Sequence, residues 1–257
     1  MRRLLRDAAR TFRPDVTDRH GPLPPLLLTL TVVTGLVDAV SYLGLGHVFV
    51  ANMTGNVVFL GFALAGAPGL SAPAALVSLG SFLTGALAGG RAGARPPTHR
   101  GRLLAVSTGT QTALIAAATA VSALAPVGQA ATGVRYALIV LLGLGMGLQN
   151  AVVRRLGVPD LTTTVLTLTL TGLAADSAAT GRTATGRTAT GRTATGGTAR
   201  RVLSVLAMFL GALTGAWLFP RWGIAATLGP ALTLLAVTAV VAHRLSADDA
   251  VWARPGS

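Results

Sequence analysis

The first long apolar stretch of the chain, residues 26–46, reads LLLTLTVVTGLVDAVSYLGLG. A helix needs about 20 mainly apolar residues to cross a bilayer, and this stretch provides them. It is too long for the apolar part of a signal peptide, and it contains Asp38 instead of ending at a small-residue cleavage site. The stretch therefore predicts a transmembrane helix.

The rest of the chain has the same character. Of its 257 residues, 51% are hydrophobic and 11% are charged, and the mean hydropathy is +0.64. These values exclude an ordinary soluble domain and a disordered tail, and they predict an all-α integral membrane protein. Eight apolar runs are candidate membrane segments: 26–46, 47–66, 74–90, 103–125, 134–153, 161–176, 203–219 and 223–243.

Charge predicts the topology. Every basic residue is Arg and every acidic residue is Asp, with a net charge of +13. In a soluble protein this excess would suggest nucleic acid, but in membrane proteins arginine collects in cytoplasmic loops. If residues 47–66 and 161–176 enter the bilayer and return, 19 of the 21 basic residues fall on one side. We therefore predict about six transmembrane helices plus two re-entrant or short segments, both termini in the cytoplasm, a plasma-membrane location and no nucleic-acid partner.

The same reading divides the chain into segments. A basic arm (1–25), a first membrane half (26–125), a second membrane half (134–243) and a cytoplasmic tail (244–257) follow one another. The arm suits a short helix on an anionic leaflet and a disordered arm equally well. Residues 177–202 contain the pentad Thr-Gly-Arg-Thr-Ala three times, and this low-complexity sequence predicts a disordered linker within the second half.

The two halves share short motifs. The stretch Gly-Leu-Val-Asp-Ala-Val at 35–40 aligns with Gly-Leu-Gln-Asn-Ala-Val at 147–152, an offset of 112. Further on, Leu-Thr-Gly-Ala at 83–86 aligns with Leu-Thr-Gly-Ala at 213–216, an offset of 130. With three crossings in each half, the second copy is inverted. Inverted repeats with paired interrupted segments are typical of secondary transporters, whose substrate site lies near the midplane.

Small residues recur every four positions in two of the runs, which predicts close helix packing. They are Ser81, Gly85 and Gly89 in one run, and Ala207, Gly211 and Gly215 in the other. Two partners fit these stripes: the opposite half of the same chain, or a second copy in a homodimer.

Asp38 is the ionisable residue placed inside a predicted span. A carboxylate at the centre of a span costs on the order of 3 kcal/mol, so such residues are usually retained for function. We interpret Asp38 as a proton or cation site. The alternative is a hydrogen-bonding role toward backbone groups that are exposed where the following segment breaks off.

The next run carries a second polar group, Ala-Asn-Met-Thr-Gly-Asn at 51–56. Its amides, hydroxyl and glycine disfavour a continuous helix. Asn52, Thr54 and Asn56 therefore line a solute site or satisfy a broken backbone, and the pattern leaves both interpretations open. Gln149 and Asn150, from the matching motif of the second half, complete the candidate site.

Other chemistry is not indicated. The chain has no Cys, and its four histidines are far apart, so no metal site and no cofactor are predicted. No phosphate-binding loop, nucleophile elbow or dinucleotide fingerprint occurs in a suitable context, and we do not expect an enzyme. A membrane enzyme would need a second acid facing Asp38, and Asp160 and Asp176 are the candidates for that role.

The motifs around 35–43, 48–56 and 147–151 resemble those of the YoaK-like family of bacterial inner-membrane proteins, a domain of unknown function. The resemblance extends over roughly residues 26 to 243. It implies a multi-spanning plasma-membrane protein and no assigned activity.

The leading hypothesis is a small-solute secondary transporter or permease in which Asp38 binds a proton or cation. The expected partners are the lipid bilayer and an unidentified small solute or proton. A non-catalytic membrane scaffold or subunit is the first alternative, and a membrane-embedded enzyme is the second.

Overall fold

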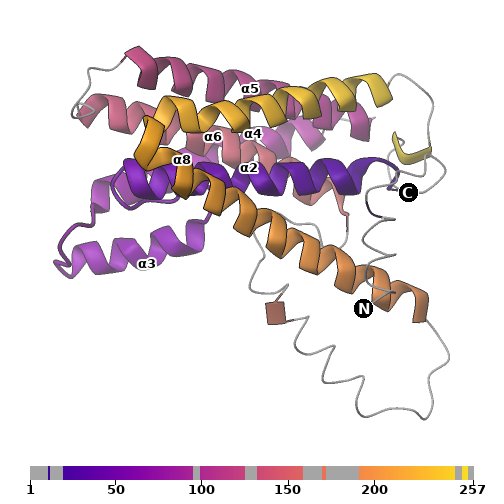
Figure 1. Cartoon of the computed structure of the whole chain (residues 1–257), viewed down its shortest axis with the longest axis horizontal. Coiled ribbons are helices and arrows are strands. Elements are labelled where there is room, and N and C mark those ends of the chain that lie inside the picture. Colours follow the sequence, from indigo (N-terminus) through magenta and orange to yellow (C-terminus); the bar gives the residue numbers. More distant parts are fainter. Residues whose placement is uncertain are drawn as a thin grey trace, which may run out of the picture.

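The fold is helical throughout the part of the chain that a computed structural model describes: Thr11 and residues 20–94, 99–124, 132–158, 170–171, 191–246 and 251–253. These residues contain no strand, which confirms the predicted all-α class. The elements are α2 (Leu23–Gly44), α3 (Met53–Leu64), α4 (Ala72–Ala94), α5 (Arg100–Leu124), α6 (Thr132–Leu156), α8 (Gly191–Leu245) and the short 3-10 helix η1 (Val251–Ala253) (Figure 1).

Most of these helices are long and apolar enough to cross a membrane: α2, α4, α5, α6 and the part of α8 that covers 198–245. The exception is α3, whose 12 residues give a length of about 18 Å against a hydrocarbon thickness of about 30 Å. The predicted run 47–66 thus contains a short helix that is not long enough to cross. The other predicted re-entrant segment, 161–176, lies outside the described residues except for 170–171.

A break divides α8 into two helices. Gly223 has φ 73° and ψ −172°, a conformation that residues with a side chain rarely adopt. Pro220, three residues earlier, lacks the N–H that a continuing helix needs. The chain therefore folds back at this point (Figure 1), and its two parts correspond to the predicted runs 203–219 and 223–243.

The start of α8 corrects one expectation. Residues 191–202 belong to this helix, so the prediction that they form part of a disordered linker was wrong. Extending an existing helix costs far less than starting one, and the apolar run that begins at Leu203 holds the helix in place. Ala199, in this part of the helix, is buried. The preceding part of the linker, 177–190, lies outside the described residues.

Helix ends that are distant in sequence meet at one end of the bundle. The indole of Trp252 packs against Gly21, just before α2, and against Gly101, in the first turn of α5. The guanidinium of Arg100 donates hydrogen bonds to the carbonyl oxygens of Leu156 and Trp252, and Arg155 lies against Gly93 at the end of α4. Successive long helices therefore alternate in direction, as six crossings require.

Arginine marks this end, which we call the arginine end. Eight described arginines lie in the helix turns near it: Arg91, Arg100, Arg102, Arg154, Arg155, Arg200, Arg201 and Arg244. Near the opposite end, which we call the far end, are Arg135 at the start of α6 and Arg221 at the break in α8. This distribution agrees with the segregation of charge predicted from the sequence.

Two pairs of parallel helices form the packed centre: α2 with the first part of α8, and α4 with α6. Gly147 of α6 lies against the backbone of Phe82 and Ala86, and Gly35 of α2 lies in the same way against Met208 and Ala212. Between α2 and α6, the helices that carry these two glycines, the offset is 112, as predicted.

Between α4 and the first part of α8, the offset differs from the predicted value. It is 126, one helical turn less than the 130 read from the Leu-Thr-Gly-Ala match. The small-residue stripes thus pack between the two halves of one chain: Gly85 meets Leu144, and Gly211 meets Val32.

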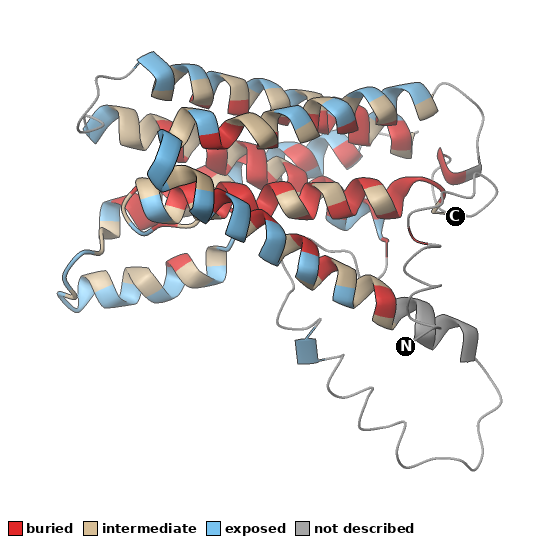
Figure 2. Cartoon of the chain, viewed as in Figure 1, coloured by how far each residue is buried: buried red, intermediate tan, exposed pale blue. Residues whose placement is uncertain are grey.

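Figure 2 shows α2 buried along most of its length, with the other helices around it. By contrast, α3 packs mainly on α4 and leaves half of its residues exposed, with Asn56 as its buried residue. The packed centre therefore consists of long helices, and α3 is attached to its side near the far end.

Candidate functional site

The candidate site begins where the chain leaves α2. After Gly44 the backbone enters the left-handed region at Gly46 (φ 92°) and His47 (φ 58°), and it then runs without helical hydrogen bonds until Met53. A non-helical segment at membrane depth is tolerated only where protein groups satisfy its backbone. We call residues 49–51 the linking strand, although they are non-helical residues that belong to no β-sheet. The N–H and C=O groups of these residues need hydrogen-bond partners.

Asp38 supplies two of these partners. It lies on α2, about 9 Å before the end of the helix by rise per residue, and is 4% exposed. Its Oδ1 accepts the backbone N–H groups of Val50 at 3.0 Å and Ala51 at 2.8 Å. Its Oδ2 is buried and has no hydrogen-bond partner in the described part of the chain. One oxygen of the carboxylate thus fixes the linking strand, and the other is left available.

Asn56, in the first turns of α3, supplies the partners of Phe49. Its Oδ1 accepts the N–H of Phe49 at 2.8 Å, and its Nδ2 donates to the C=O of the same residue at 2.6 Å. Ser78 of α4 donates to that carbonyl as well, and it also accepts from Asn56 Nδ2 at 3.1 Å. Asn56 is completely buried and its main hydrogen-bonding groups are used within the protein.

Aromatic side chains hold the linking strand from its other side. The ring of Phe49 stacks on Tyr42 of α2, with 5.1 Å between ring centroids, and on Phe59 of α3, with 5.8 Å, and Tyr42 and Phe59 also contact each other at 6.0 Å. This stacking ties α3 to the end of α2. The position of the strand therefore rests on both hydrogen bonds and ring packing.

Two of the predicted site residues have exposed side chains that make no hydrogen bond to this group in the described part of the chain. Asn52 occupies the position before α3, makes no side-chain capping bond and is exposed. Thr54 is exposed as well.

Gln149 belongs to a second buried cluster, which joins three helices. Its Nε2 donates to Thr34 Oγ1 of α2 at 2.9 Å, and its Oε1 accepts from Gln111 Nε2 of α5 at 2.7 Å. The Oε1 of Gln111 is buried and has no hydrogen-bond partner among the described residues. We call Thr34, Gln111 and Gln149 the amide cluster.

The sequence analysis did not single out Gln111 and Thr34. The available signal was a glutamine within an apolar run, at the end of the polar stretch Ser-Thr-Gly-Thr-Gln at 107–111. Thr34 carried no such signal, because threonine is frequent throughout the spans and usually bonds to its own helix. Its hydroxyl does so here too, donating to the C=O of Leu30 at 2.9 Å.

Asn150 does not join Asp38. It is half-buried on α6, and its Nδ2 donates to the C=O of Met146, one turn earlier, at 2.9 Å. Of the six predicted site residues, the structure thus brings Asp38 and Asn56 together on the linking strand. Gln149 is connected to them through α2, because Thr34 lies one helical turn, about 6 Å, before Asp38.

Comparison with known proteins places the chain among membrane proteins without an assigned activity. Residues 26–241 match the family described as "Protein of unknown function (DUF1275)". The chain is similar to the UPF0700 transmembrane protein YoaK of Bacillus subtilis (strain 168), with 32% identity over 147 residues. The alignment covers 55% of this chain and 61% of that relative. No solved structure matches the chain.

Proposed function

Because this chain belongs to the DUF1275 family of multi-pass membrane proteins, whose description assigns no activity, its function has to be argued from the site, and we propose that it is a permease for a small solute. In this proposal Asp38 binds the coupling proton or cation. The amide cluster lies on the same path, one turn further toward the arginine end.

The observation that carries the proposal is the Oδ2 atom of Asp38, which is buried without a hydrogen-bond partner in the described residues. Buried polar atoms are nearly always paired, and an exception calls for an explanation such as a bound proton, ion or water. The Oε1 of Gln111 is a second such atom. Two available oxygens near the central helix suit a solute or ion pathway.

The arrangement of the halves supports the same function. Equivalent glycines make equivalent contacts at offsets of 112 and 126, although the two halves run in opposite directions along the bundle. Asp38 lies where an interrupted segment, consisting of the linking strand and α3, begins. Secondary transporters bind ions and substrates at such interruptions within inverted repeats.

Orientation forms part of the proposal. Cytoplasmic loops collect arginine, so we place the arginine end and both termini in the cytoplasm, and the protein in the plasma membrane. Trp217 and Trp222 lie near the break in α8, and the guanidinium of Arg221 lies 4.4 Å from the Trp217 ring. Tryptophan is enriched at both membrane interfaces, so these residues fit an interface at the far end, and the arginine distribution makes that interface the outer one.

The proposal favours a proton or a cation over an anion as the coupling species, because Asp38 is the acidic residue of the described part of the chain. It also treats the protein as a permease and not as an enzyme. Asp160 and Asp176, the candidates for a second acid, lie outside the described residues.

Flux measurements test the proposal. The purified protein is reconstituted in liposomes, and flux of a solute panel is measured at several pH values for the wild type and for Asp38→Asn. We expect wild-type flux to depend on pH and Asp38→Asn to lose this dependence. The substitution is structurally mild, since an asparagine Oδ1 still accepts from Val50 and Ala51.

The amide nitrogen of the substituted residue also has a partner. We expect it to donate to the C=O of Thr34 one turn earlier, by analogy with Asn150, which donates to Met146 at the equivalent position. Thr84→Val is the matched control, because Thr84 is exposed on α4 and its hydroxyl bonds to its own helix. An unchanged pH profile in Asp38→Asn would refute the role of the carboxylate. Absence of flux across the panel for the wild type, with a partner that co-purifies, would favour the scaffold alternative.

A further inference from the structure

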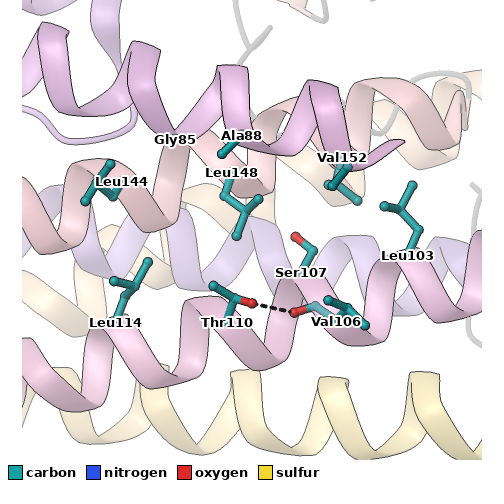
Figure 3. A pocket seen from close by; sticks show the side chains of 11 residues that line it. Gly85, Ala88, Leu103, Val106, Ser107, Thr110, Leu114, Leu144, Leu148 and Val152 are labelled. Atoms are coloured by element: carbon teal, nitrogen blue, oxygen red, sulfur yellow. Dashed lines mark hydrogen bonds between the residues drawn. The ribbon is translucent and has the colours of Figure 1, made fainter. Parts of the chain in front are cut away.

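A groove on the side of the bundle is separate from the candidate site. It has a volume of about 310 Å³ and lies between α4, α5 and α6 (Figure 3). It exists because α4 and α5 hardly contact each other, while both pack against α6. Among its lining residues are Ala88, Ala92, Val106, Thr110, Leu148 and Val152.

The lining is apolar in chemical terms. Thr110 and Ser107 contribute hydroxyls; that of Thr110 donates to the C=O of Val106 at 2.9 Å within its own helix, and the other lining residues are apolar (Figure 3). The side chains of Ala88, Ala92 and Val106 are exposed, so the groove opens on the outer surface of the bundle. On a spanning helix that surface faces lipid, and an acyl chain matches such a lining.

The groove has the depth of one leaflet. Along α5 its lining runs from Leu103 to Leu114, which is about 16 Å by rise per residue. The hydrocarbon core is about 30 Å thick, so one leaflet contributes about half of that. The groove starts at the arginine end, because Leu103 lies in the first turn of α5.

Two arginines stand at this mouth of the groove. Arg102 lies one turn before Val106 on the same face of α5, and it is exposed. Arg155 follows Val152 by three residues on α6, is exposed, and extends along Gly93 of α4. The acidic residue of the described part of the chain, Asp38, is near the far end, so no described carboxylate neutralises these guanidinium groups.

We propose that this groove binds one anionic glycerophospholipid. One acyl chain lies in the groove between α4 and α5, and the phosphate lies between Arg102 and Arg155. Guanidinium groups bind phosphate with paired hydrogen bonds, and basic residues next to an intramembrane groove attract anionic headgroups. The proposal does not depend on transport and holds equally for a permease and for a scaffold.

Native mass spectrometry in detergent tests the proposal with two probes, dioleoylphosphatidylglycerol and dioleoylphosphatidylcholine. We expect the wild type to retain one phosphatidylglycerol at about tenfold lower lipid concentration than phosphatidylcholine. Ala88→Phe fills the groove and lowers retention of both lipids about fivefold, since the acyl chain no longer fits there. Arg102→Gln and Arg155→Gln each lower retention of phosphatidylglycerol alone.

Matched controls make the same kinds of substitution at positions outside the groove. Ala216→Phe adds the same side chain at an exposed alanine of α8, and Arg244→Gln removes one charge from the same end of the bundle but outside the groove. Both controls are expected to bind like the wild type. Ala92→Phe, also at an exposed alanine, repeats the groove test if Ala88→Phe loses its helix content or elutes as an aggregate.

Three results would overturn the proposal. One is equal retention of the two lipids by the wild type, and another is unchanged retention by correctly folded Ala88→Phe and Ala92→Phe. The third is conversion of a dimer to a monomer by these variants without a change in lipid retention, which would assign the groove to a second copy of the chain.

Discussion

At the scale of single residues, Asp38 and Asn56 both bond to the backbone of residues 49–51, but they differ in the hydrogen-bonding atoms that remain without a partner. Both satisfy backbone groups of a strand that has no helical hydrogen bonds. Asn56 uses its oxygen and its nitrogen for this purpose, whereas Asp38 uses one oxygen, and its other oxygen has no hydrogen-bond partner in the described part of the chain. We therefore assign Asn56 a structural role, and we expect the second carboxylate oxygen of Asp38 to bind a proton or cation.

A stability measurement checks the assignment of Asn56. Asn56→Ala leaves the N–H of Phe49 buried without its partner, and we expect a loss of about 2–3 kcal/mol in the free energy of unfolding. The quantity is measured by titration with a denaturing detergent in mixed micelles. Thr54→Ala, at an exposed position of the same helix, should change it by no more than about 0.5 kcal/mol. Equal effects of the two substitutions would contradict the assignment.

At the scale of helices, glycines decide which partners pack together. The backbones of α4 and α6 approach so closely at Gly147 that a Cβ there would overlap the carbonyl oxygen of Phe82. The equivalent Gly35 of α2 faces the carbonyl oxygen of Met208 in α8. Small residues permit such approaches, which bring dispersion contacts along the whole pair of helices. Each half of the chain thus packs one helix into the other half.

Alanine substitutions test this equivalence. Gly147→Ala and Gly35→Ala should each destabilise the protein by about 2–3 kcal/mol, because the backbones must move apart. Gly109 of α5 has open space where its Cβ would lie, so Gly109→Ala should leave stability unchanged or raise it slightly. The same detergent titration compares the three variants. A large loss for one central glycine and none for the other would contradict equivalent packing of the halves.

At the scale of the whole molecule, the two ends of the helix bundle differ in their contacts and composition. The arginine end is held together by Trp252, which contacts residues at the starts of α2 and α5, and by Arg100, which bonds to the end of α6. The far end carries the break in α8 and the short helix α3. We therefore expect the two ends to face opposite sides of the membrane, with the linking strand and α3 entering and leaving at the far end.

Labelling of single cysteines tests this topology in a chain that has none of its own. Ala65→Cys and Gly133→Cys, at the far end, should react with a membrane-impermeant maleimide added to intact cells. Ala94→Cys and His243→Cys, at the arginine end, should react after the membrane has been permeabilised. Labelling of Ala94→Cys in intact cells would mean that the segment around α3 crosses the membrane.

The sequence alone determined the class of the protein, the positions of the long helices and the separation of charge. Apolar length and the location of arginine are properties of each segment by itself, so they can be read without knowing what a segment contacts. The offset of 112 between Gly35 and Gly147 could also be read, because the motifs around these glycines are distinctive.

What only the tertiary structure decided are the partners. The stripes of small residues repeat every four positions, so a shift by one turn preserves the pattern, and only the packed backbones distinguish an offset of 126 from 130. Whether Asn56 faces a solute or a backbone depends on Phe49 and on Ser78, 22 residues away. The bond between Gln111 and Gln149 forms because α5 and α6 pack together. Hydrogen bonds between segments follow from packing, and packing is not a property of any one segment.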